Sequence, residues 1–343
     1  ETESLTLYRD ALATLAELAR AVPGVPQYEL DLIVAQDNLA LLLHSLGACG
    51  DAEPLVTAAV ERLQSVTETQ DGLPIPTAFL EAGAVTYATY GTILQDFGQL
   101  QDAADAYTIA IELLTRMADG DFEHVAPVHR RTLAIVQSNF ARLLARAGDA
   151  DEARLYFSKS ETTLNNRLKD APDDHESADA LAWACFHFGS AEYDLNNQPK
   201  AATLFTRALA LWDSVPQKYE LRHGQLWLLL TCVDETQRDP ARALLLAELL
   251  AADTVECSRL QALLALAHLQ NSEPEKALLS ADESLRIHSD GNSAATFVKA
   301  VAYHRTGQPE KARASYDEAL TTLNTHHPDR RLALYLRDIA SDT

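Results

Sequence analysis

The sequence predicts an all-α solenoid, in which helix-turn-helix units repeat along the chain and each unit packs on its neighbours. Three observations lead to this fold class. The chain of 343 residues is 47% hydrophobic and rich in alanine and leucine, which are strong helix formers. One pattern of small, bulky and aromatic residues recurs along it. The alanines that mark the second helix of each unit are spaced as expected for stacked helix pairs.

Residues 87–110 show the pattern most clearly. Four residues are expected to share one face of a first helix: Tyr87, Tyr90, Gly91 and Leu94. Gly98 is expected to end this helix, because glycine adopts the left-handed C-cap conformation at little cost. A stripe on the second helix follows, formed by Ala103, Tyr107 and Ala110. The small residue at 91 therefore allows the second helix to approach closely.

This pattern resembles the tetratricopeptide repeat (TPR). In that repeat the first helix reads bulky-x2-bulky-small-x2-bulky and the second helix reads alanine-x3-aromatic. The resemblance implies a right-handed α-α superhelix of helix-turn-helix repeats, a TPR solenoid. It also implies that the first helices line a concave face, and that this face binds proteins or peptides.

Residues 1–22 are expected to form the second helix of a truncated repeat. Tyr8 and Ala11 occupy the places of Tyr107 and Ala110, but no first helix precedes them. The chain also lacks an initiator methionine, since its only methionine is Met117. We therefore expect the parent protein to extend upstream.

Seven repeats are expected to follow, ended by a capping helix. The second-helix alanines are Ala52, Ala103, Ala153, Ala201, Ala243, Ala277 and Ala312. Their successive intervals are 51, 50, 48, 42, 34 and 35 residues. Residues 31–214 are therefore predicted to hold four long repeats and residues 222–325 three shorter ones, with the capping helix at 328–341. The expected helix stops are Gly47, Gly98, Gly148, Asn196 and Gly307.

Residues 17–47 resemble a narrower group, the TPR regions of large bacterial serine/threonine protein kinases. The stretch ELARAVPGVPQYELDLIVAQDNLALLLHSLG contains a proline-rich connection and then a first helix with an Asn-Leu pair. The resemblance implies a kinase domain N-terminal to the repeats. The chain itself has no glycine-rich phosphate loop, no H-R-D catalytic loop and no D-F-G.

The net charge of −22 argues against nucleic-acid binding, which depends on lysine and arginine contacts to phosphate. It argues equally against anionic membranes. Four scattered cysteines fit neither a disulfide framework nor a zinc motif: Cys49, Cys185, Cys232 and Cys257. They are interpreted as thiols in a reducing compartment, and a cytoplasmic protein is expected.

No catalytic, metal-binding or cofactor-binding motif is recognisable, so no cofactor and no enzymatic activity are predicted. The pair His326–His327 lacks the further ligands that a zinc centre requires. His124 and His129 lie beside Arg130 and Arg131, which is compatible with a small anion site or with an ordinary surface loop.

The expected partner-binding residues lie on the inward side of the first helices: Asn38, Asn139, Arg142, Arg146, Trp183, Phe186, His187 and Tyr193. Asn38 and Asn139 stand where carboxylate-clamp TPR modules place asparagine, but Val34 stands where such a clamp has lysine. Trp183 and Phe186 either line the groove or pack between helices. Arg142 and Arg146 either bind a partner or pair with local acids such as Asp149 or Asp151.

The predicted function is non-catalytic binding of a protein or peptide, as a scaffold or regulatory region of a larger bacterial protein. The main surface is expected on repeats three and four, centred on Arg142, Arg146, Trp183 and His187. Such a surface suits a partner with an acidic or C-terminal carboxylate segment. The alternative is a small-molecule sensor that regulates an attached kinase.

Overall fold

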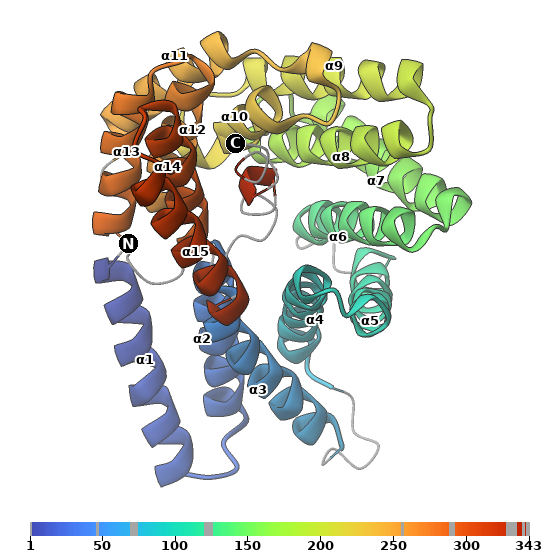
Figure 1. Ribbon diagram of the computed structural model, residues 1–343. Helices are drawn as coiled ribbons and strands as arrows, with labels where there is room; N and C mark the ends of the chain where they lie inside the picture. The colour runs from blue at the N-terminus through green and yellow to red at the C-terminus, as the bar shows by residue number, and fades with distance from the viewer. Residues whose placement is uncertain are drawn as a thin grey trace. The chain divides into compact units, whose positions relative to one another are not determined.

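The fold consists of helices joined by short turns, as seen in a computed structural model that describes residues 2–45, 48–68, 75–119, 126–254, 257–287, 292–326, 335–337 and 340 (Figure 1). These residues form α-helices and one 3-10 helix, with no strand among them. The predicted all-α class is thereby confirmed. The chain divides into two compact units, Glu1–Ser160 and Glu161–Thr343.

Unit 1 is a series of helix pairs. Its helices are α1 (Thr2–Ala21), α2 (Pro26–Ser45), α3 (Cys49–Glu68), α4 (Thr77–Phe97), α5 (Leu100–Asp119), α6 (Ala126–Ala147) and the first half of α7 (Ala150–Asp170). Each of α1 to α5 contacts the next helix, and α4 also contacts both α2 and α6. The helices α2, α4 and α6 are therefore the first helices of successive repeats.

Unit 2 continues the same plan after the second half of α7. Its helices are α8 (His175–Asp194), α9 (Gln198–Ser214), α10 (Tyr219–Thr231), η1 (Glu235–Gln237), α11 (Pro240–Asp253), α12 (Ser258–Gln270), α13 (Pro274–Ile287), α14 (Ser293–Arg305) and α15 (Pro309–His326). Of the predicted capping helix at 328–341, residues 335–337 and 340 are helical and the others lie outside the described residues. Leu336 is fully buried in the core of unit 2.

The turn inside a repeat has one recurring geometry. Its left-handed residue stands five positions before the second-helix alanine, as seen at Gly98, Gly148, Asn196, Ser272 and Gly307. At Gly98 the backbone N–H donates to the oxygen of Gln95, and the next N–H donates to Leu94. The other four turns repeat both bonds, which satisfy carbonyls at the helix end.

The helix stops predicted at Gly98, Gly148, Asn196 and Gly307 are confirmed by their positive φ angles. Gly47 lies outside the described residues. The repeat that contains Ala243 departs from the pattern. Its corresponding residue, Arg238, has a φ of −76°, and η1 forms the connection instead.

The alanines that mark the second helices are mostly buried in the structure. Six of them are fully buried: Ala52, Ala103, Ala153, Ala201, Ala243 and Ala277. Ala312 is half-buried. Between α4 and α5, Tyr107 is fully buried and its ring lies over Gly91. A side chain at 91 would have to displace this ring.

Replacing Gly91 with leucine is expected to lower the free energy of unfolding by about 1–3 kcal/mol, because overpacking strains a closed interface. A Cβ at this position would lie 3.0 Å from the Cδ1 atom of Tyr107. Urea unfolding followed by far-UV circular dichroism measures the change. Val85→Leu, at an exposed position of the same helix, is the control. An unchanged unfolding midpoint in Gly91→Leu would contradict the assigned packing.

The N-terminal helix α1 packs against α2 within unit 1. Its Leu5 and Leu12 pack against the cluster around Leu39. Tyr8 is 38% exposed, whereas the equivalent Tyr107 is fully buried.

No described helix combines the length and the apolar composition that crossing a bilayer requires.

Candidate partner-binding surfaces

The first helices α2, α4 and α6 of unit 1 together form one surface, which we name the first-helix face. Two side-chain contacts fix how α2 lies beside α4. Thr89 donates a hydrogen bond to Asp37, and His44 Nε2 lies 2.9 Å from Asp96 Oδ2. Both pairs are 52 residues apart in sequence, so the two helices run parallel and in register.

A row of exposed aliphatic side chains crosses this face. It consists of Val34, Val85 and Ile135, with exposed fractions of 42%, 43% and 37%. Each stands eighteen residues before the buried alanine of its repeat, namely Ala52, Ala103 and Ala153. Because three repeats present an aliphatic side chain at one equivalent position, the row follows from the repeat and is not a scatter of surface residues.

The predicted asparagines also occupy equivalent positions, fourteen residues before the same alanines. Asn38 is exposed on α2 and Asn139 is half-buried on α6. The equivalent residue of α4, between them, is the buried Thr89. The two amides therefore lie on the same face but come from helices separated by α4.

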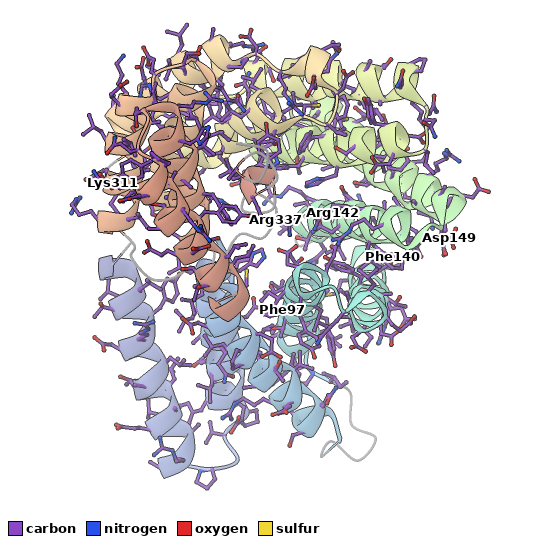
Figure 2. All side chains as sticks on the ribbon, in the orientation of Figure 1. Phe97, Phe140, Arg142, Asp149, Lys311 and Arg337 are labelled. Carbon is purple, nitrogen blue, oxygen red and sulfur yellow. The ribbon has the colours of Figure 1, made fainter. Side chains whose placement is uncertain are left out.

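Arg142 is anchored inside unit 1 (Figure 2). Its Nη2 donates to Gln95 Oε1 at 3.0 Å, and the Tyr107 hydroxyl donates to the same oxygen at 3.2 Å. Gln95 and Tyr107 are both fully buried. Burial raises the pKa of Tyr107, and the positive charge of Arg142 opposes that rise. Arg142 therefore holds α6 against α4, in addition to any contact with a partner.

Arg146 stands one helical turn beyond Arg142 and is exposed. Within the described part of the chain it forms no ion pair. Of the local acids, Asp151 pairs with Arg154. Arg146 is thus a cation available at the end of the first-helix face.

Beneath the face lies a buried carboxyl group on α2. Asp37 is 4% exposed, and burial raises its pKa to about 6, against the hydrogen bond from Thr89. The Oδ1 of Asp37 and the Oε1 of its neighbour Gln36 have no hydrogen-bond partner among the described residues. An ionised carboxylate here is costly, because burial removes it from bulk solvent and its Oδ1 has no hydrogen-bond partner among the described residues.

In unit 2, Trp183 of α8 is the centre of an aromatic cluster. Its ring stacks on His187 at 5.2 Å and lies 5.3 Å from the ring of His223 on α10. It also meets Trp212 of α9 edge to face at 5.5 Å. Trp183 stands eighteen residues before Ala201, so it occupies the position of the exposed aliphatic row of unit 1.

The predicted site residues of α8 differ in burial. Trp183, His187 and Tyr193 are half-buried and retain surface. Phe186 is buried, with its ring against Phe205 and Trp212. The prediction that Phe186 contacts a partner does not fit this burial, because a core side chain supports the surface but does not form it.

Two groups that support the cluster were missed from the sequence. Asp179 accepts a hydrogen bond from Trp212 Nε1 at 2.7 Å, and burial raises the pKa of Asp179 to about 7. Gly224 lies under both indole rings, where a Cβ would be 2.3 Å from Trp212 Cζ2 and 2.7 Å from Trp183 Cε2. A glycine in the interior of a helix is itself a sequence signal for such close packing.

The combined patch centred on Arg142, Arg146, Trp183 and His187 draws on both units. The two arginines belong to unit 1, and Trp183 and His187 belong to unit 2. The patch therefore stays a prediction, and each group is described within its own unit.

Other predicted features lie outside these surfaces. His124 and His327 fall outside the described residues, and so does the side chain of His326. His129 Nε2 lies 3.4 Å from Glu81 Oε1, so its partner is a carboxylate. Among the described residues, His44, Cys49 and Asp96 form a group able to bind a metal ion.

Comparison with known proteins finds one family match, to the tetratricopeptide repeat, over residues 233–292. None of the curated proteins compared matches the chain. Two similar solved structures are each 16% identical to this chain, with TM-scores of 0.43. The first, BtubC from P. vanneervenii, matches over 96% of this chain and 94% of its own. The second, a tetratricopeptide repeat protein from Parabacteroides merdae, matches over 89% of this chain and 99% of its own. Yeast Tom70 is 13% identical, with a TM-score of 0.39, over 98% and 73%.

The family match covers η1, α11, α12 and α13. It includes Ser272, whose left-handed conformation follows the turn geometry of the other repeats. The match supports the prediction of a tetratricopeptide repeat protein and places a repeat of this type in residues 233–292.

Proposed function

We propose that this chain is a non-catalytic binding protein that takes a protein or peptide partner on the first-helix face of unit 1. The observation that carries the proposal is the row formed by Val34, Val85 and Ile135. Single exposed aliphatic residues are common on protein surfaces, but here they recur at one repeat position on three successive first helices and form a row across the face. Such a row suits an apolar stripe of a partner helix or extended segment.

The charge of the face suggests what else the partner carries. Arg146 is exposed in a chain whose net charge is −22. A guanidinium selects carboxylates through paired hydrogen bonds, and the surrounding negative charge disfavours wholly acidic partners. The proposed partner is therefore an apolar segment with one acidic side chain or a C-terminal carboxylate at its end.

The apolar row is tested by a triple variant, Val34→Ser, Val85→Ser and Ile135→Ser. Peptides are first selected on the wild-type chain from a displayed library, and their affinities are then measured by isothermal titration calorimetry. We expect the triple variant to bind at least about tenfold more weakly, because it loses three apolar contacts.

A matched control places serine at two exposed aliphatic positions on the second helices of the same unit, Ile109 and Leu155. This control should bind like the wild type. Equal affinity of the wild type and the folded triple variant for every selected peptide would reject the first-helix face. A selection that yields no peptide preferring the wild type over the triple variant would reject it as well.

The role of charge is tested at Arg146 alone. Replacing both arginines with glutamate would also remove the bond between Arg142 and Gln95, so a loss of binding would be ambiguous. Arg146→Glu is expected to lower the affinity for peptides that carry a carboxylate by about tenfold at low salt, and Arg146→Gln is expected to lower it by less. Equal affinities of the two variants and the wild type would mean that Arg146 does not contact the partner.

The alternative function is a small-molecule sensor, and a pocket in the structure bears on it. One pocket in unit 2 has a volume of about 200 Å³ and is lined by Ala300, His304, Pro309, Ala312, Arg313, Tyr316 and Ala340. Pockets for drug-sized ligands commonly enclose about 300–1,000 Å³. The attachment to a bacterial kinase and the cytoplasmic location remain predictions, and the sequence of the parent gene upstream of Glu1 tests the attachment.

A further inference from the structure

Three side chains with metal-binding atoms meet at one end of the first two repeats of unit 1. His44 lies in the last turn of α2, Cys49 is the first residue of α3, and Asp96 lies in the last turn of α4. One ligand atom from each residue lies within 4.8 Å of the others. We propose that these residues bind a zinc ion.

The backbone holds the three groups in place. The turn between α2 and α3 is closed by a hydrogen bond from the Ala48 N–H to the Leu43 oxygen, which fixes Cys49 next to the end of α2. The parallel register of α2 and α4 brings Asp96 beside His44. Leu43, Ile93 and Phe97, which are close in sequence to His44 and Asp96, belong to one apolar cluster that packs α2 against α4. Ligands on rigid, packed helix ends need little reorganisation to bind an ion.

The distances are compatible with tetrahedral coordination. With Zn–S near 2.3 Å and Zn–N or Zn–O near 2.0–2.2 Å, neighbouring ligand atoms are separated by about 3.3–3.7 Å. His44 Nε2 and Asp96 Oδ2 are 2.9 Å apart, and no pair of the three ligand atoms exceeds 4.8 Å. Shifts of about 1 Å or less in side chains therefore bring all three atoms to coordination distance.

The chemistry of the donors selects the ion. A thiolate and an imidazole favour zinc, whereas magnesium and calcium prefer oxygen donors. Three protein ligands leave a fourth position for water. His44 and Asp96 have side-chain exposures of 18% and 16%, so both solvent and the ion can reach them. On binding, Cys49 loses its thiol proton to solvent and the ion replaces the contact between His44 and Asp96.

Cys185 and Cys232 differ from Cys49 in having no other potential ligand grouped with them among the described residues. Burial raises the pKa of the Cys185 thiol to about 12 and that of Cys232 to about 11, so the thiolate form is disfavoured at both. A bound zinc ion would connect the end of α2 and the start of α3 to the end of α4, and would stabilise unit 1 by an amount that grows with the logarithm of the zinc concentration.

The test is metal titration of the full chain after chelator treatment and reduction, with cobalt(II) as the spectroscopic probe and zinc as competitor. We expect one cobalt per chain, with a sulfur-to-cobalt charge-transfer band that zinc abolishes. Cys49→Ser should remove the band. Asp96→Asn should weaken binding by more than the roughly 10- to 100-fold that is lost when a residue supporting a ligand is changed, because Asp96 is itself a ligand. Zinc should also raise the melting temperature of the wild type, and much less that of Cys49→Ser.

His129→Gln is the matched control, because His129 also faces a carboxylate in unit 1 but belongs to no group of three potential ligands among the residues that the structure describes. It should bind cobalt like the wild type. Absence of the charge-transfer band in the wild type, or a band that persists in Cys49→Ser, would overturn the proposal. If Cys49→Ser does not fold, Asp96→Asn and His44→Gln decide the question, since unchanged cobalt affinity in both also overturns it.

Discussion

Gly224→Ala is expected to destabilise unit 2 by about 1–3 kcal/mol, although the same change in a helix interior ordinarily stabilises. Alanine exceeds glycine in helix propensity by about 1 kcal/mol, so the expected sign is the opposite of the intrinsic preference. The cause is the position of Gly224 under Trp183 and Trp212, where an added Cβ would lie 2.3 Å from the Cζ2 of Trp212. Contacts this short force one of the rings to move.

Trp212 is the ring that cannot move freely. It is fully buried, and its Nε1 donates to Asp179 at 2.7 Å. Trp183 is half-buried and can shift outward, but its stacking on His187 would then be lost. The substitution should therefore reduce stability and also disturb the surface that Trp183 helps to form.

Tryptophan fluorescence measures this prediction in the intact chain, because the three tryptophans, Trp183, Trp212 and Trp227, all belong to unit 2. Urea unfolding gives the change in free energy from the shift of the midpoint. The control is Gly83→Ala on α4 of unit 1, followed by far-UV circular dichroism because unit 1 contains no tryptophan; a Cβ there would lie 3.5 Å from Leu113 Cδ1, an ordinary contact. Gly83→Ala should be neutral or stabilising. A Gly224→Ala variant at least as stable as the wild type would disprove the close packing.

The sequence predicted the parts of the fold that local signals determine. Gly98 and Asn196 were expected as left-handed helix stops, and both have positive φ angles. The buried stripe of Tyr107 and its neighbouring alanines followed from helical periodicity. Ser272 adopts the same conformation without any such signal. At that position the packing of the flanking helices, and not the residue type, imposes the turn.

The candidate sites could be predicted only in part, because they depend on which helices become neighbours. The first helices and their exposed positions followed from the repeat. The bond between Arg142 and Gln95 joins residues 47 apart, and the pair of His44 with Asp96 joins residues 52 apart. No local pattern records such pairings. Phe186 fitted the surface periodicity but packs inward, because aromatic spacing alone does not distinguish core from groove.

Asp37→Asn is expected to stabilise unit 1 at pH 7 by about 1–3 kcal/mol. In the folded chain burial raises the pKa of Asp37 from its ordinary 3.8 to about 6, and its Oδ1 has no partner within the described residues. The folded protein therefore carries an uncompensated carboxylate at neutral pH. Asparagine keeps the shape of the side chain and an oxygen that can accept the hydrogen bond from Thr89, but it removes the charge.

The pH dependence has a definite sign. Below pH 3.8 the Asp37 carboxyl is protonated in both states, so it contributes no difference. Between 3.8 and about 6 the unfolded chain loses the proton while the folded chain keeps it, so stability falls as pH rises. Above about 6 both states are ionised and the loss is complete. A pKa change of this size corresponds to a loss of about 3 kcal/mol in the free energy of unfolding as the pH rises, and the asparagine variant should not show this loss.

Native-state hydrogen exchange of amides in α2 and α4 measures this effect locally, which matters because Asp179 in unit 2 has a raised pKa of the same sense. Between pH 4 and pH 7 the opening free energy of these helices should fall more steeply in the wild type than in Asp37→Asn, and the two proteins should converge near pH 4. Glu61→Gln, at an exposed position on α3, should follow the wild-type profile. Parallel profiles for the wild type and Asp37→Asn would mean that Asp37 is ionised in the folded protein well below pH 6, with a cation or water reaching its buried oxygen.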